Sequence, residues 1–379
     1  MAHLLLIFSG LAEGPTEDSP LALGTTPTLD AMARRSEVGL VQPVPDAPTV
    51  GVDLTTAALL GYNPAGLARG PLEVLGAGPS LDRRDVGARL DLISLSNPVD
   101  PRPTPPTADE AAGLWRELCG AISTPRLAVR GVRPTTALAV WNEGPVEVRC
   151  VPPGELTDAD AQLPSGEREA EVRRIIEISR ELLADHDLNR ARADQGLPTL
   201  DALWPWGLGR APELPLFVLR TGQMSSLISD NLAVRGVARA CGLNAPRAGA
   251  ERTLAGVAEE LLARLDHATT VISQSSAADT LAHAGDQEKR VDLVSALDRH
   301  VLAPLWARAE GGAELDITVL CDYACSAESR RHVNQTVPYL AWRHKRTVAG
   351  PERFTELWAA DTGRERHGHE AIRSWLWRS

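Results

Sequence analysis

Short apolar runs that alternate along the chain with segments of helical periodicity are the feature that most constrains the fold. Each run has the length of a buried strand and is bounded by turn-forming residues. We expect buried parallel strands at Leu4–Phe8, Thr269–Ile272, Ile317–Cys321 and Val337–Trp342, and helices at Leu254–Leu265 and Val291–Leu305. The alternation predicts an α/β fold, a sheet with helices on both faces. Ligands of such sheets bind beyond the carboxyl ends of the strands.

The middle of the chain departs from this alternation. Asn97–Thr107 and Leu197–Pro215 are rich in proline, and we expect a turn at Trp204–Gly207. Between the two proline-rich segments, an amphipathic helix is predicted at about Glu167–His186. Proline-rich segments are typical of the joints between domains. The sequence therefore predicts a second module inserted into the sheet domain.

Composition and charge exclude several classes of partner. The 379 residues carry a formal net charge of −11, whereas nucleic acids and anionic membranes bind basic surfaces. No apolar stretch approaches the ~18 residues of a membrane span. The five cysteines are scattered without a CxxC pair, which predicts a reducing, cytoplasmic location. No apolar stripe indicates an oligomer interface, so the oligomeric state stays open.

An aspartate and a histidine with helical spacing follow one of the predicted strands. Asp279 and His283 are four residues apart, so a helix would place both side chains on one face. They come after the Thr269–Ile272 run, where the site of an α/β protein is expected. On this spacing alone a surface pair is the commoner interpretation, and a metal site is the alternative.

Seven segments follow one another along the chain in a recognisable order and spacing. They are Thr26–Asp30, Gly61–Pro64, Gly70–Glu73, Asp85–Arg89, Trp204–Gly207, Asp279–Asp286 and His332 ahead of Val337–Pro338. Together they resemble the archaeal-type cofactor-independent phosphoglycerate mutases and bacterial relatives once proposed as homoserine kinases. The resemblance covers nearly the whole chain and implies an alkaline-phosphatase-like core sheet at 1–66 and 208–379, interrupted by an inserted α/β cap domain at 67–207.

The resemblance implies a metal site made by Asp279, His283 and His332. Active family members hold two divalent metals between a Ser or Thr nucleophile and the substrate phosphate, and an Asp-His-His set binds one of them. Oxygen and imidazole ligands suit zinc or manganese. We therefore expect one divalent metal, zinc or manganese, at these three residues.

The second metal position departs from the family pattern. The family aspartate after the first strand is Ser9 here, and the family nucleophile is Val52. The family Asp-His pair is Asp322 followed by Tyr323, so only Asp322 is kept. Valine can neither attack phosphorus nor bind a metal, and the family's two-metal chemistry is not expected.

Other residues are candidates for catalysis. Asp53 is retained beside the lost nucleophile, and carboxylates can form acyl-phosphates. Ser9 and Thr49 are predicted to lie in loops that border the same cleft, and Asp322 is the fourth candidate catalytic residue. Cys321 and Cys325 flank Asp322, so one interpretation is that they line the site, and the commoner one is that they are buried apolar fillers.

Three basic residues are candidates for binding an anionic substrate. Arg89 and Arg190 match family positions and could hold an anion through a bidentate contact. Lys289, just after the Asp279–Asp286 segment, also fits the family. A solvated or ion-paired structural role is the alternative for each of them.

Three functions remain open from the sequence. The first is a one-metal hydrolase, lyase or transferase that acts on a small anionic metabolite. The second is a non-catalytic relative that binds a metabolite or a partner protein. The third is a phosphomutase or phosphatase with an unrecognised nucleophile.

Overall fold

The chain divides into two compact units, which are described separately. A computed structural model describes residues 1–47, 50–95, 101–246 and 253–377. Unit 1 consists of Met1–Ala65 with Leu214–Ser379, and unit 2 consists of Gly66–Glu213. The proline-rich prediction at Asn97–Thr107 lies partly outside the described residues.

Unit 1 is built on a seven-stranded sheet in the order β15-β2-β14-β11-β1-β10-β9. The central strand β1 pairs in parallel with both β10 and β11, and its residues Leu4–Ile7 are almost completely buried. The strands are β1 (Ala2–Phe8), β2 (Glu37–Gln42), β9 (Ser225–Ile228), β10 (Thr270–Ser275), β11 (Leu315–Leu320), β14 (Val337–Trp342) and β15 (Glu365–His367). The first three predicted strands are confirmed as parallel neighbours at the centre of the sheet.

The direction of β14 differs from the prediction. This strand has the predicted bounds but pairs antiparallel with both β11 and β2. A parallel return to the same sheet needs a crossover as long as a strand, usually a helix. Only the short hairpin of β12 (Ala324–Ser326) and β13 (Arg331–Val333) precedes β14, and the chain therefore re-enters the sheet in the opposite direction.

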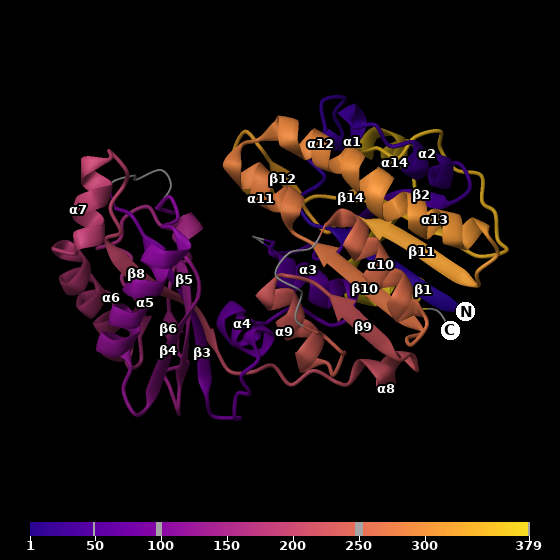
Figure 1. The fold of residues 1–379 in the computed structure, drawn as a ribbon. Coiled ribbons are helices and arrows are strands. Elements are labelled where there is room, and N and C mark those ends of the chain that lie inside the picture. The colour runs from indigo at the N-terminus through magenta and orange to yellow at the C-terminus, as the bar shows by residue number, and fades with distance from the viewer. Residues whose placement is uncertain (48–49, 96–100, 247–252, 378–379) are drawn as a thin grey trace. The chain divides into compact units, whose positions relative to one another are not determined.

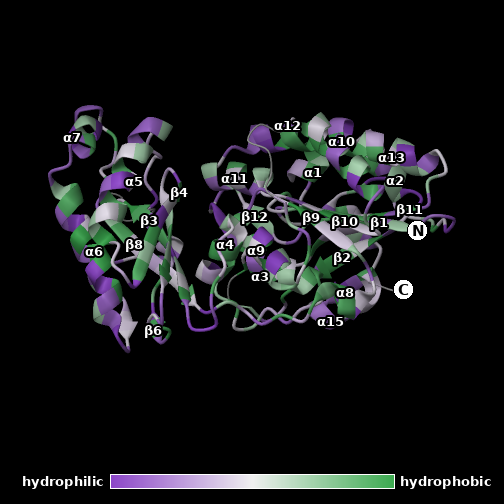
Figure 2. Ribbon diagram, turned by 60° about the horizontal axis from the view of Figure 1, so that its bottom comes forward, coloured by the Kyte–Doolittle hydropathy of each residue, from purple (hydrophilic) through white to green (hydrophobic). Residues whose placement is uncertain are grey.

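Helices cover both faces of the sheet, as the sequence predicts. Figures 1 and 2 show α10, α12 and α13 on one face and α3 and α9 on the other. The helices mix hydrophobic and hydrophilic residues, as expected for helices with one buried face (Figure 2). Every helix in the described ranges is too short or too polar to cross a bilayer. The helices are α1 (Pro20–Leu23), α2 (Pro27–Ala33), α3 (Val52–Leu59), α8 (Phe217–Thr221), α9 (Leu232–Ala240), α10 (Leu254–Leu265), α11 (Ala277–Ala284), α12 (Gln287–Leu297), α13 (Ala303–Glu310), α14 (Glu356–Asp361) and α15 (Gly368–Leu376).

The helix predicted at Val291–Leu305 is longer and is interrupted. Between α12 and α13 the chain makes a π-helical segment, η2 (Asp298–Leu302). Pro304, in the first turn of α13, has no N–H to donate, and its ring would clash with the carbonyl of His300 in a regular α-helix. The wider π turn relieves this clash. Its buried Asp298 accepts hydrogen bonds from the backbone of Thr28 and Leu29 and so caps α2.

Unit 2 is a smaller α/β structure. Its four-stranded sheet has the order β4-β5-β3-β8, and the buried residues of α5 and α6 share an apolar core with its strands. The predicted amphipathic helix is confirmed as α6. The elements are α4 (Arg69–Ala77), β3 (Val86–Ile93), α5 (Ala108–Ile122), β4 (Leu127–Arg133), β5 (Thr136–Trp141), β6 (Val148–Arg149), η1 (Pro153–Glu155), β7 (Ser165–Gly166), α6 (Glu169–Ala184), α7 (Asp187–Asp194) and β8 (Ala202–Gly209).

The turn predicted at Trp204–Gly207 is wrong, because this segment is part of strand β8. Pro205 lies opposite Leu90 of β3 in the antiparallel ladder. Proline cannot donate to a ladder and is tolerated in edge strands, and β8 is an edge strand of this sheet. The indole of Trp204 is fully buried in a second small core, so burial outweighs the turn signal of the proline.

Two helical glycines of unit 2 test how tightly α4 packs on the sheet. A Cβ added at Gly70 would lie 2.4 Å from the Cα of Ala88 and 2.6 Å from the carbonyl oxygen of Gly207, both of which are backbone atoms. At Gly113 of α5, a Cβ would meet nothing within 4 Å. Gly70→Ala should destabilise unit 2 by about 1–3 kcal/mol. Gly113→Ala should stabilise it by about 0.5–1 kcal/mol.

Urea unfolding followed by circular dichroism measures both variants against the wild type. The changes in the free energy of unfolding must have opposite signs, and their magnitudes need not be equal. A Gly70→Ala variant as stable as Gly113→Ala would contradict the close approach of α4 to β3 and β8.

Candidate metal centre

The carboxyl ends of β1, β10 and β11 bring three chain segments together at one edge of the unit 1 sheet. Ser9 directly follows β1, and Asp322 follows Cys321 at the end of β11. Helix α11 starts almost immediately after β10, which places Asp279 in its first turn and His283 one turn later. Gly10 allows the β1 loop to pack against this helix, because its φ is +69° and a Cβ would lie 2.6 Å from the Cα of Asp279.

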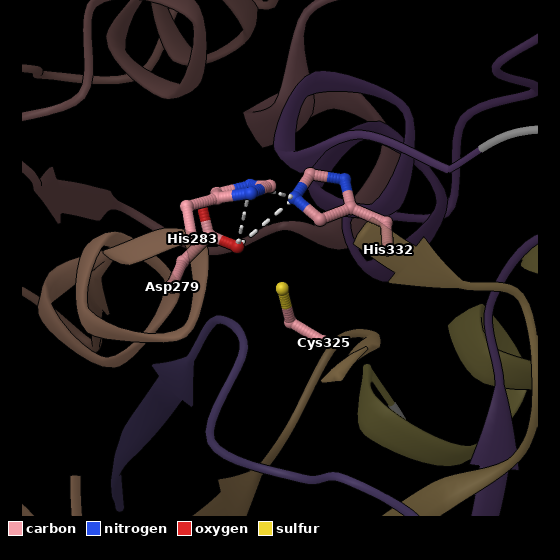
Figure 3. Close-up of side chains that lie close together, drawn as sticks. All are labelled: Asp279, His283, Cys325 and His332. Carbon is pink, nitrogen blue, oxygen red and sulfur yellow. Dashed lines mark hydrogen bonds and ion pairs between the residues drawn. The ribbon is translucent and has the colours of Figure 1, made fainter. Parts of the chain in front are cut away.

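The β12–β13 hairpin adds two further side chains from β11's side of the sheet. Cys325 and His332 are directly opposite each other in its antiparallel register. Directly opposite residues of an antiparallel pair project to the same face. The hairpin therefore places a thiol and an imidazole side by side, and Figure 3 shows both near the Asp279 and His283 side chains of α11.

Four potential ligand atoms converge at this point. The Nε2 atom of His332 lies 2.9 Å from Oδ1 of Asp279 and 3.0 Å from Nε2 of His283. The Nε2 atom of His283 is 3.7 Å from the same carboxylate oxygen. The Sγ atom of Cys325 completes a set whose members all lie within 4.8 Å of one another. In the described ranges this is the one group of three or more His, Cys, Asp and Glu side chains that converges in this way.

Backbone carbonyls assign the tautomers of both histidines. The Nδ1 atom of His283 lies 2.8 Å from the carbonyl oxygen of Arg330, and the Nδ1 atom of His332 lies 2.8 Å from that of Val50. A carbonyl only accepts, so each Nδ1 carries the hydrogen. Each neutral ring then directs the lone pair of its Nε2 at the other ring and at Asp279. Ligating histidines typically have this arrangement.

The electrostatics of the group favour a cation. Burial disfavours a charged His332, but the Asp279 carboxylate outweighs burial and raises the pKa of this imidazole. Burial likewise opposes the Asp279 carboxylate, yet the two histidines and the hydroxyl of Tyr323 lower its pKa. Burial and then the Asp279 carboxylate raise the pKa of Cys325 to about 12. A proton or a metal ion is therefore the group that satisfies the facing acceptors.

Asp322, where the resemblance implies a ligand of a second metal, is surrounded by a network of hydroxyl groups. Ser9 donates to Oδ2 of Asp322 at 3.0 Å, and Thr55 of α3 donates to the same oxygen at 2.8 Å. The side-chain amide of Gln274 donates in turn to the Ser9 hydroxyl at 2.8 Å. Burial raises the pKa of Asp322 to about 7 despite these two hydrogen bonds. Its Oδ1 atom is buried without a hydrogen-bond partner.

The remaining catalytic candidates lie beside this network. Val52 is the first residue of α3, and Asp53 is buried in the first turn of the same helix. Thr49 lies outside the described residues. The Cys321 side chain is buried and its thiol is free.

The basic candidates are engaged in ion pairs. In unit 2, Arg89 pairs with Glu73 at 2.7 Å and with Asp91 at 2.8 Å, and its guanidinium lies over the ring of Trp206. These contacts favour the structural alternative for Arg89. Its substrate-binding role stays a prediction.

Arg190 and Lys289 are more exposed. Arg190 of α7, in unit 2, pairs with Asp187 and lines an open hollow of about 610 Å³. In unit 1 the ammonium of Lys289 pairs with Asp286 at 2.6 Å, close to the start of α12. Their substrate-binding roles also stay predictions.

Three further residues of this region contact the ligand set or Asp322. The sequence leaves Cys325 open between lining the site and filling the core, presents Tyr323 only as the loss of a histidine, and gives no signal for Thr55. One signal could have placed the thiol. If the segment between Asp322 and Val337 is expected to form a short hairpin, a register that pairs Cys325 with His332 puts both side chains on one face.

Tyr323 supports the metal-ligand group. Its ring lies 4.4 Å from that of His332, centroid to centroid, and its hydroxyl contacts the Asp279 carboxylate. Tyr323, which stands where the resemblance implies a histidine ligand, therefore contacts two of the candidate metal ligands.

A family model, and relatives that match nearly the whole chain, point to the same group of proteins. Residues 33–189 match the sequence model of the family "2,3-bisphosphoglycerate-independent phosphoglycerate mutase". A protein of that name from Methanosarcina mazei is 28% identical over 360 residues, with 90% of this chain and 91% of the relative covered. Another such mutase, from Methanothermobacter thermautotrophicus, is 29% identical over 360 residues. That match covers 89% of this chain and 88% of the relative.

Solved structures share the fold. A Pyrococcus horikoshii protein matches with a TM-score of 0.76 and 21% identity, and the match covers 99% of this chain and 96% of that one. The cofactor-independent phosphoglycerate mutase of Thermoplasma acidophilum matches with a TM-score of 0.60 and 19% identity, over 99% of each chain. The resemblance found in the sequence is confirmed: along about nine tenths of its length the chain is similar to the archaeal cofactor-independent phosphoglycerate mutases, and it shares their fold.

Proposed function

We propose that the protein binds one divalent metal, zinc or manganese, through Asp279, His283 and His332. The observation that carries this proposal is the pair of Nε2 atoms, 3.0 Å apart, whose lone pairs face each other beside a carboxylate oxygen. Atoms bound to one ion at about 2.0–2.2 Å lie no more than about 4.4 Å apart. The three separations of 2.9, 3.0 and 3.7 Å are compatible with a shared ion.

The contacts around Asp322 support a single ion. A second ion there would have one carboxylate, and the two hydroxyls that contact this carboxylate donate hydrogen bonds to it. Divalent cations bind deprotonated oxygen ligands, and an acid whose pKa is about 7 is only partly deprotonated at neutral pH. Val52 and Tyr323 offer neither a hydroxyl nucleophile at the start of α3 nor an imidazole after Asp322.

We infer that this metal serves a reaction on a small anionic metabolite without a phosphoserine intermediate. A bound divalent metal supplies Lewis-acid activation of an oxygen atom or of a water molecule. The side chains of Asp279, His283 and His332 are 17%, 26% and 24% exposed, so solutes can reach them. Asp322 can hold a proton near neutral pH, because burial raises its pKa to about 7 against the hydrogen bonds that Ser9 and Thr55 donate to it. The reaction class is a hydrolase, lyase or transferase.

Metal content tests the ligand assignment. Purified full-length protein should contain about one equivalent of divalent metal by mass spectrometry. Asp279→Asn and His332→Ala should each lower the content at least about tenfold, because each removes a direct ligand. The exposed His300→Ala variant is the matched control and should retain the wild-type content.

Two outcomes contradict the proposal. Two equivalents in the wild type would restore the family's two-metal site. Unchanged metal content in Asp279→Asn and His332→Ala would show that the metal binds elsewhere.

The pKa of Asp322 predicts a pH dependence of stability in the metal-free protein. Because burial raises the folded-state pKa of Asp322 to about 7, the folded protein keeps a proton that the unfolded chain loses near pH 4. The stability that this proton contributes is fully present below about pH 4 and is lost as the pH rises to 7. Asp322→Asn removes this titration. Between pH 4 and 7.5 the variant should gain about 2–4 kcal/mol relative to the wild type.

Urea unfolding across this pH range measures the difference, and the exposed Asp292→Asn variant is the control. Parallel pH profiles for the wild type and Asp322→Asn would show that Asp322 is ionised in the folded protein at low pH. That result would remove one argument against a second metal.

A further inference from the structure

Cys325 is the fourth member of the convergent group, and the resemblance to the phosphoglycerate mutases assigns it no role. Its Sγ atom lies within 4.8 Å of the ligand atoms of Asp279, His283 and His332. Figure 3 shows the sulfur pointing towards the Asp279 carboxylate, with its side chain entering from the side opposite α11. The thiol is not in a disulfide.

The backbone places this thiol independently of the side-chain conformation. In the β12–β13 register, Cys325 is directly opposite His332, so both residues project from the same face of the hairpin. The N–H group of Cys325 donates to the carbonyl of Ala12 at 3.0 Å. Its carbonyl accepts a hydrogen bond from Arg290 at 3.1 Å. Both backbone groups of the cysteine are therefore tied to neighbouring segments.

Arg290 fixes the hairpin to the loop after β1. Its side chain is fully buried, and the Nη2 atom that donates to Cys325 also donates to the carbonyl of Gly10 at 2.8 Å. The Nη1 atom pairs with Glu13 at 3.1 Å. One guanidinium thus connects the strand that carries Cys325 to the loop that packs against Asp279.

We propose that Cys325 is a fourth metal ligand, which makes the site selective for zinc over manganese or magnesium. This inference rests on the proposed metal site. Two imidazoles, one carboxylate and one thiolate form a four-ligand set typical of tetrahedral zinc. The two negative charges of the carboxylate and the thiolate balance the charge of one divalent ion. Thiolate is a soft ligand that favours zinc and cobalt, whereas manganese and magnesium prefer oxygen.

Binding through sulfur changes the chemistry of the site. The S–H bond of Cys325 breaks as the metal–sulfur bond forms, and the proton passes to solvent. Four protein ligands close the tetrahedral shell, as in structural zinc sites, whereas three leave a position for water or substrate. The metal that is bound thus determines whether the site is closed or open. The reaction proposed above therefore belongs to the form of the site in which Cys325 is not bound to the metal, and the four-ligand zinc form is closed to water and substrate.

Cobalt substitution tests the fourth ligand without any assay of activity. Full-length protein freed of metal by a chelator is titrated with Co²⁺, and the near-ultraviolet thiolate-to-cobalt charge-transfer absorption is recorded. The wild type and the Cys321→Ser control should show this absorption, while Cys325→Ser should bind cobalt without it. Zinc affinity, measured by competition with a chromophoric chelator, should fall at least about 100-fold in Cys325→Ser. Manganese affinity should change less than about threefold.

The outcomes separate this inference from the proposed metal site. In one outcome, the wild type binds cobalt without the charge-transfer absorption, while Asp279→Asn no longer binds cobalt. This result would contradict Cys325 as the fourth ligand and would support the three-ligand metal site. Absorption that persists in Cys325→Ser also overturns the fourth ligand, because another thiol would be the ligand. A wild type that binds no cobalt overturns both. If Cys325→Ser does not fold, the wild-type spectrum with the Cys321→Ser control decides the question.

Discussion

Two imidazole nitrogens and a carboxylate oxygen face one another at the carboxyl edge of the sheet, and the account of this protein depends on that arrangement. Backbone carbonyls bind the other nitrogen of each ring and so fix the orientation of both Nε2 lone pairs. Such a cluster of acceptors is stable only with a cation or a proton between its members. The parallel strands β10, β1 and β11 provide the framework, because their ends bring residues that are far apart in the sequence to one edge.

The two groups of polar side chains at this edge, around Asp279 and around Asp322, differ in how they are satisfied. At one, the Nε2 atoms of two histidines converge on the Asp279 carboxylate, which also contacts the Tyr323 hydroxyl. At the other, the hydroxyls of Ser9 and Thr55 already donate to Asp322. Tyr323 connects the two, since it stands where the family has a ligand of the second metal and contacts Asp279 of the first. Under the proposal of a single metal ion, the hydrogen bonds to Asp322 take the place of a second ion.

Local sequence signals predicted much of the fold and part of the site. The bounds of α10 and β14 follow from helical and strand periodicity, and the helical spacing of Asp279 and His283 placed both side chains on one face of α11. Features that depend on distant parts of the chain were not predictable. The direction of β14 depends on the hairpin before it. Trp204–Gly207 can form a strand because Pro205 lies at the edge of a sheet, and local sequence propensity carries no information about that position.

Two contacts of the site also depend on distant parts of the chain. Cys325 has an ordinary sequence context, and only the hairpin register shows that it faces His332. Thr55 contacts Asp322 because α3 packs near the end of β11, a long-range contact without a sequence pattern.

Anomalous X-ray diffraction from crystals of the metal-loaded protein tests the central claim most directly. We expect a single anomalous peak, between Asp279, His283 and His332. A second peak beside Ser9 and Asp322 would contradict the single-metal proposal, and so would the absence of any peak.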